Sequence, residues 1–115
     1  MSALSKSRDD LVTRALVKLT VIGSGQSPDA EDAASIDAAI DGILGDLAAR
    51  DVVAVADDDA IPAEWFEDLA EIVAQHCARD FGRAKDQAEI ERAERALVKK
   101  GAPGPTYQRQ TAEYF

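Results

Sequence analysis

Residues 62–82 read PAEWFEDLAEIVAQHCARDFG, and this stretch carries the strongest helical signal of the chain. Pro62 suits the first turn of a helix, and Gly82 suits its end or a kink. We expect the most apolar helix here, at the centre of the fold. The side chains of its buried face recur at helical spacing: Trp65, Phe66, Leu69, Ile72, Val73, His76, Cys77 and Phe81.

Two helices are predicted before it. Ser7 can cap the first, with Asp9 and Asp10 near the positive end of the helix dipole, and an end near Thr20. Leu16 belongs to its apolar face. The apolar stripe of the second helix is formed by Ile36, Ile40, Ile43, Leu44 and Leu47.

The second helix is expected to start with Ser27 as the cap and Pro28 at the first helical position. Gly42 and Gly45 each cost about 1 kcal/mol in a helix relative to alanine. They either allow another helix to approach closely or are simply tolerated.

Two further segments complete the body. Residues 52–55 read VVAV and predict an extended segment or an edge strand, followed by an acidic loop at residues 57–59. Residues 85–100 predict a highly charged fourth helix, stabilised by pairs such as Glu89–Arg92 and Glu91–Arg95. The apolar stripe of this helix is narrow, so we expect the helix to lie on the outside of the bundle or to pack between subunits. The stripe is formed by Ile90, Ala93, Leu97 and Val98.

Residues 101–115 read GAPGPTYQRQTAEYF and carry half of the chain's aromatic residues. One interpretation is an end with chance aromatics. The other is an extended docking tail, stiffened by prolines, with side chains that anchor it in a partner. The anchoring set is Pro103, Pro105, Tyr107, Arg109, Tyr114 and Phe115. The predicted fold is therefore all-α, a small bundle of about four helices over residues 1–100 with a short extended segment and this tail.

The charge is acidic and uneven. Residues 1–68 hold 5 Lys or Arg against 15 Asp or Glu, whereas residues 69–115 hold 8 against 7. Phosphate binding needs clustered cations, so the acidic front argues against wrapping DNA. The first twenty residues lack the apolar run of a signal peptide, and no stretch is long enough to span a membrane. We expect synthesis in the cytoplasm.

Sites for chemistry are weak. Residues 23–25 lack the lysine and spacing of a P-loop, and residues 57–59 lack the spaced ligands of a calcium loop. His76 and Cys77 are neighbours on a helix, so their side chains diverge. A structural histidine and a buried thiol are the simpler interpretation. We expect no enzyme, cofactor or metal site, although converging ligands would revive a small hydrolase or metal enzyme.

The order of these segments resembles the phage head-to-tail adaptor family, also called tail accessory or packaged-DNA-stabilising proteins. Residues 10–19, DLVTRALVKL, resemble the family's opening, and the second helix leading into residues 51–53 resembles its long helix and extended segment. Residues 61–66, IPAEWF, with residues 80–82, DFG, resemble the start and end of its central helix. The resemblance covers residues 9–100 and includes the charged fourth helix.

The resemblance implies a ring of about twelve subunits under the portal, at the head–tail neck of the virion. Such a ring extends the DNA channel, which DNA crosses without sequence-specific binding, and offers a platform for tail or stopper proteins. The C-terminal segment would bind the portal protein. The alternative is a small acidic helical binding module, such as a regulator or an antitoxin-like partner, which would be a stable monomer or dimer.

Overall fold

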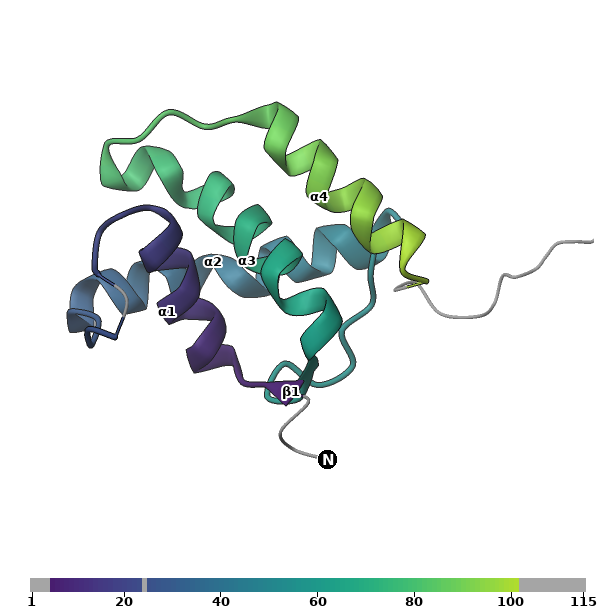
Figure 1. Ribbon diagram of the computed structural model, residues 1–115, viewed down its shortest axis with the longest axis horizontal. Helices are drawn as coiled ribbons and strands as arrows, with labels where there is room; N and C mark the ends of the chain where they lie inside the picture. Colours follow the sequence, from purple (N-terminus) through teal and green to yellow (C-terminus); the bar gives the residue numbers. More distant parts are fainter. Residues whose placement is uncertain (1–4, 24, 102–115) are drawn as a thin grey trace, which may run out of the picture.

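Helix α3 (Ala63–Cys77) lies at the centre of the protein, and the other helices pack around it (Figure 1). The computed structural model describes residues 5–23 and 25–101. Within these residues the predicted all-α bundle of about four helices is confirmed. The remaining elements are α1 (Arg8–Lys18), α2 (Ala30–Ala49), α4 (Gln87–Lys99), the short 3₁₀ helix η2 (Ala78–Phe81), and the strands β1 (Ser5–Lys6) and β2 (Ile61–Pro62).

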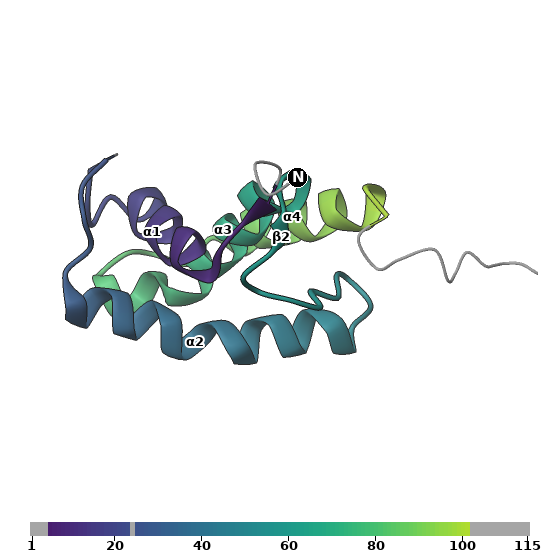
Figure 2. The same ribbon diagram turned by 90° about the horizontal axis from the view of Figure 1, so that it is seen from below.

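The helices form two layers. Helices α1, α3 and α4 make one layer, and α2 runs beneath it as the other (Figure 2). Helix α3 contacts all three of the other helices, and α1 also contacts α2. Most of the surface of α3 is therefore covered, which fits its strongly apolar sequence.

The hydrophobic core lies between these layers. Leu16 of α1, Ile36, Ile40 and Leu47 of α2, and Phe66, Leu69, Ile72 and Val73 of α3 are all buried. Leu44, Trp65 and Phe81 are partly buried and pack against this core. His76 differs from the expected buried face, because it is exposed at the edge of the stripe.

The starts of α1 and α2 illustrate one correct and one wrong prediction. Ser7 caps α1 as predicted. The N–H of Asp10 donates to the Ser7 hydroxyl at 3.1 Å, and the N–H of Ser7 donates to the Asp10 carboxylate at 3.0 Å. Helix α2 is capped by Asp29 instead of Ser27, and Pro28 lies before the helix. Aspartate caps as well as serine does, and here its carboxylate accepts a bond from the N–H of Glu31 at 3.2 Å.

The strand interpretation of residues 52–55 is wrong. Val52 and Val53 are buried, but the N–H of Val52 donates to the carbonyl of Leu47 at 2.9 Å, so the run closes the end of α2. The extended pairing occurs elsewhere, between the antiparallel strands β1 and β2. Burial of these valines thus serves helix packing and needs no sheet partner.

The end of α1 depends on a long-range hydrogen bond. The helix ends at Lys18, and Thr20 beyond it has a left-handed backbone with φ 58°. This conformation is costly for a β-branched residue. Arg83, after η2, donates to the Leu19 carbonyl at 3.0 Å and to the Thr20 hydroxyl at 2.9 Å. These bonds hold the turn and attach it to the chain that leads into α4.

Arg8 joins three separate parts of the fold. Its guanidinium contacts Asp37 at 2.6 Å and Asp41 at 2.8 Å on α2, and Asp58 at 2.6 Å in the loop before β2. It also donates to the Asp37 carbonyl at 2.8 Å. The Arg8 side chain is only 18% exposed, so these contacts are partly shielded from water. One side chain therefore fixes the start of α1 against α2 and the acidic loop.

We expect Arg8→Ala to destabilise the protein by about 2 kcal/mol, because three carboxylates lose their shared cation and then repel one another. Urea unfolding at neutral pH measures this loss. Arg79→Ala is the matched control, since Arg79 is exposed and takes part in no ion pair among the described residues. Equal stability of the two variants would contradict the role of Arg8.

Candidate binding groove

The predicted tail residues lie outside the part of the chain that the structure describes. This applies to the whole anchoring set: Pro103, Pro105, Tyr107, Arg109, Tyr114 and Phe115. The structure does describe the place from which that segment departs. Gly101 follows the last turn of α4 with φ 74°, and its N–H donates to the Val98 carbonyl at 3.1 Å. A glycine in this conformation ends the helix and redirects the chain.

The end of α4 is held against α3 by a buried carboxylate. Asp68 of α3 is only 7% exposed, and its Oδ2 accepts a bond from the Lys100 ammonium at 2.8 Å. Lys100 also donates to the Glu64 carbonyl at 2.9 Å, and Arg92 lies 3.8 Å from the other oxygen of Asp68. The departure point of the C-terminal segment is thus fixed on the body by charge and hydrogen bonding.

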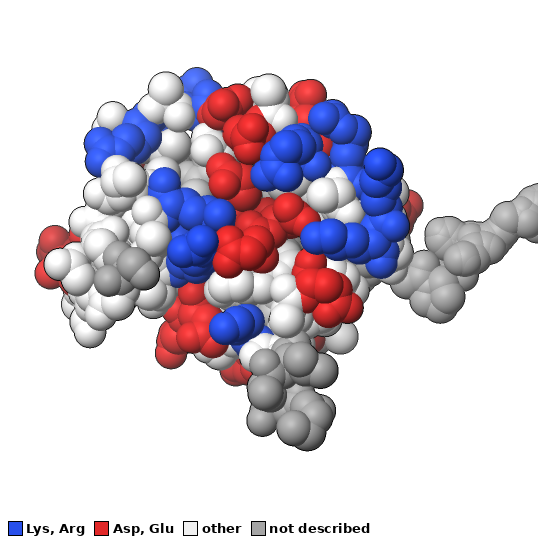
Figure 3. Space-filling model, in the orientation of Figure 1, with Lys and Arg blue, Asp and Glu red and all other residues white. Residues whose placement is uncertain are grey.

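Asp68 belongs to a row of acidic side chains along α3. Arg14 and Lys18 of α1 both lie 3.1 Å from Glu67, and Lys18 also reaches Glu71 at 3.6 Å. Figure 3 shows this acidic band over α3 between basic groups over α1 and α4. The ion pairs on both sides show that the carboxylates of α3 stabilise helix packing rather than form an open anionic site.

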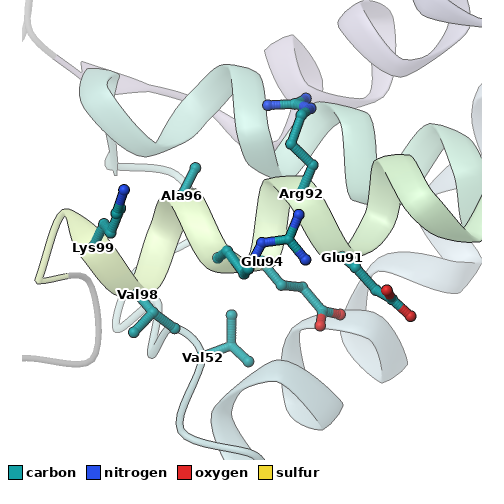
Figure 4. A pocket seen from close by; sticks show the side chains of 8 residues that line it. Val52, Glu91, Arg92, Glu94, Ala96, Val98 and Lys99 are labelled. Atoms are coloured by element: carbon teal, nitrogen blue, oxygen red, sulfur yellow. The ribbon is translucent and has the colours of Figure 1, made fainter.

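An open groove of about 730 Å³ lies beside α4, between this helix and Val52 (Figure 4). Its apolar part is formed by Val52, after α2, and Val98 of α4, whereas the lining residue Ala96 points to the other side of the helix. Val98 is 50% exposed and is the only exposed large hydrophobic side chain among the described residues. The other lining residues are Glu91, Arg92, Glu94, Arg95 and Lys99.

Val98 does not share one helix face with the other residues of the predicted narrow apolar stripe, so that grouping is wrong. Ile90, Ala93 and Leu97 are buried at steps of three and four residues, as one helix face requires. Val98 follows Leu97 directly and therefore points about 100° away from it. The sequence signal that could have identified the exposed valine is this break in spacing.

The charges of the groove are partly fixed and partly free. The Arg50 guanidinium holds the Glu94 carboxylate through bonds of 3.1 and 2.7 Å and also contacts Asp46. The hydrogen bonds to Glu94, and then to Asp46, raise the pKa of Arg50. By contrast, Arg95 and Lys99 have no ion-pair partner among residues 5–23 and 25–101. The groove thus offers an apolar patch beside two available cations.

The other candidate sites have structural explanations. In the acidic loop, Asp58 binds Arg8, and the Asp57 carboxylate accepts a bond from the N–H of Asp59 at 3.0 Å. The three carboxylates lie close together, but a cluster of exposed acids is common without a metal. No helix within the described ranges is both long enough and apolar enough to cross a bilayer.

His76 and Cys77 occupy different environments. His76 is exposed, whereas Cys77 is buried, and burial together with the charge of Asp80 raises the pKa of the Cys77 thiol to about 11. A thiol of this kind carries little thiolate at neutral pH and is a poor nucleophile. This geometry does not form a cysteine–histidine catalytic pair.

Comparison of the chain with family models, curated proteins and solved structures returned no match.

We expect Lys100→Ala to cost about 1–2 kcal/mol, because Asp68 then keeps only the distant Arg92 as a cationic partner. Hydrogen exchange in the last turn of α4 should accelerate. Lys99→Ala is the matched control, since it removes a neighbouring lysine without an ion pair among the described residues. Unchanged exchange in Lys100→Ala would contradict the attachment of α4 through Asp68.

We expect Cys77 to react slowly with a thiol reagent in the folded protein at pH 8, because the side chain is buried and its pKa is raised. The measurement is the rate of modification before and after urea unfolding. A large increase on unfolding is the expected result. Equally fast modification in both states would contradict a buried structural thiol.

Proposed function

We propose that the chain is a structural adaptor of a phage or a related gene-transfer particle. It forms a ring of about twelve subunits beneath the portal, extends the DNA channel and provides a platform for tail or stopper proteins. It is made in the host cytoplasm and ends at the head–tail neck of the virion. It performs no catalysis and binds no cofactor, and DNA crosses it without sequence-specific contacts.

The order of the helices carries this proposal. A first helix is followed by the long α2, by the buried valines after it, and by Ile61–Pro62, which leads into the central α3. Helix α3 ends at Cys77, η2 continues to Phe81 and is closed by Gly82, and the charged α4 follows. The resemblance to head-to-tail adaptors rests on this same order of segments, including Ile61–Pro62 at the start of the central helix, and this order supports the proposal.

The charge of α2 supports the DNA-channel part of the proposal. Helix α2 carries five acidic residues and no basic residue between Ala30 and Ala49. Arg8 compensates Asp37 and Asp41 only in part, because its single positive charge is shared among three carboxylates, and the Asp41 side chain is 82% exposed. A negatively charged wall repels the phosphate backbone, so a genome could pass along it without being held.

A second candidate is a small acidic binding module that works as a monomer or dimer. The observation in its favour is the shortage of exposed apolar surface. Apart from Val98, no large hydrophobic side chain in the described residues is exposed. Extensive subunit interfaces usually bury larger apolar patches.

The mass of the purified protein in solution separates these functions. It is measured alone and after mixing with the portal protein from the same genome. The adaptor proposal predicts a ring-sized complex with the portal, because the chain should assemble on that template. A monomer or dimer that forms no complex with the portal protein would contradict the adaptor proposal and favour the binding module.

The same assay tests the portal-binding role of the C-terminal segment. A chain in which Tyr107, Tyr114 and Phe115 are replaced by serine should lose the complex, because the aromatic anchors are gone. Thr106→Ser and Thr111→Ser together form a matched control with the same segment length and its aromatics intact. Retention of the complex by the triple variant would reject the tail as the portal anchor.

A further inference from the structure

Val98 requires an explanation, because it is the only large hydrophobic side chain that the described residues leave exposed. It belongs to the groove of α4, and Figure 4 shows it extending from the helix toward Val52. Isolated exposed valines are common on proteins. Here, however, the valine lines a groove of about 730 Å³ next to Arg95 and Lys99, which have no ion-pair partner among the described residues.

We propose that this groove binds the chain's own C-terminal segment, with one or more of Tyr107, Tyr114 and Phe115 packed over Val98. The segment folds back along α4 of the same subunit. The proposal goes beyond the adaptor function and does not rest on it, because the groove and the segment have the same chemistry in either proposed role.

The chain is long enough to make this contact. Gly101 is bonded to Val98 through their backbones, so the segment departs from the edge of the groove. The groove follows α4 from Glu91 to Lys99, which is about 12 Å along a helix. The six residue-to-residue steps from Gly101 to Tyr107 span about 20 Å when extended. Tyr107 can therefore reach any part of the groove, and the later aromatics lie within reach as well.

The chemistry of the groove and the segment is complementary. An aromatic ring can pack over Val98 with Val52 beside it, while Arg95 and Lys99 can approach ring faces or the carboxylate of Glu113. The left-handed Gly101 redirects the chain at the end of α4, as a return along the helix requires.

The same subunit is a better source for this occupant than a second copy. A tethered segment acts at an effective concentration in the millimolar range, so a weak contact is still populated. A stable dimer generally needs about 1,200 Å² or more of buried surface, whereas the groove offers a few side chains around one half-exposed valine. An intramolecular contact therefore fits the size of the patch.

Methyl NMR of the full chain tests the proposal. The Val98 methyl signals should be shifted upfield by an aromatic ring, with contacts to tyrosine or phenylalanine ring protons. The shift should be lost when Tyr107, Tyr114 and Phe115 are all changed to serine. It should persist in the Thr106→Ser, Thr111→Ser control. Val98 signals that are identical in both variants would overturn the proposal.

Two further measurements make the result specific. Val98→Asp should remove the contacts between aromatic rings and the neighbouring Val52 methyl groups, whereas Ala88→Asp, on an exposed part of α4 outside the groove, should leave them unchanged. The contacts should also be independent of protein concentration. Contacts that vanish on dilution would mean that a second copy supplies the segment, which would overturn the intramolecular assignment. None of these measurements involves the portal, so their outcome is separate from that of the adaptor assay.

Discussion

The burial of α3 is the constraint on which the rest of the structure depends. This helix is apolar over most of its circumference, and its large side chains can leave water only if other elements cover several sides at once. Helices α1 and α4 cover it within its own layer, and α2 covers it from below. Among the described residues Phe66 is the one buried aromatic side chain, so the stability of the core relies on many small aliphatic contacts.

Charge decides how the covering helices are oriented on α3. Helix α3 carries a row of carboxylates, and cations from α1 and from the end of α4 bind exposed Glu67 and buried Asp68 from the two sides. Arg8 performs the same task between α1, α2 and the acidic loop. A strongly acidic chain is thereby able to pack closely, because Arg8, Lys18 and Arg50 each contact more than one carboxylate.

The candidate binding groove lies at the end of α4, next to the last of these ion pairs between helices. Lys100 and Asp68 hold the last turn of α4 in place, and directly beyond it the chain enters the segment that contains half of its aromatic residues. The exposed Val98 and the available cations lie beside the same point. The adaptor proposal gives that segment an external partner, and the groove gives it a site on its own subunit. Binding to the portal would then compete with binding to the groove.

Much of the fold follows from local sequence. The period of α3, the capping box at Ser7 and the terminating Gly82 are short-range signals, and each has the structure that its residues indicate. Local signals fail where alternatives are close in energy. Ser27 and Asp29 are both good caps, and a run of valines suits a strand as well as a buried turn.

Long-range contacts account for what the sequence could not indicate. Asp68 lies only 7% exposed because Lys100, 32 residues later, can reach it, and no local pattern encodes that distance. Val98 is exposed because the register of α4 on α3 selects Ile90, Ala93 and Leu97 for burial. Sequence alone accounts for the helices and for most of the residues that begin and end them, since these depend on neighbours three or four residues away. Only tertiary packing decides which carboxylate is buried and which valine lines a groove, since both depend on how separate helices meet.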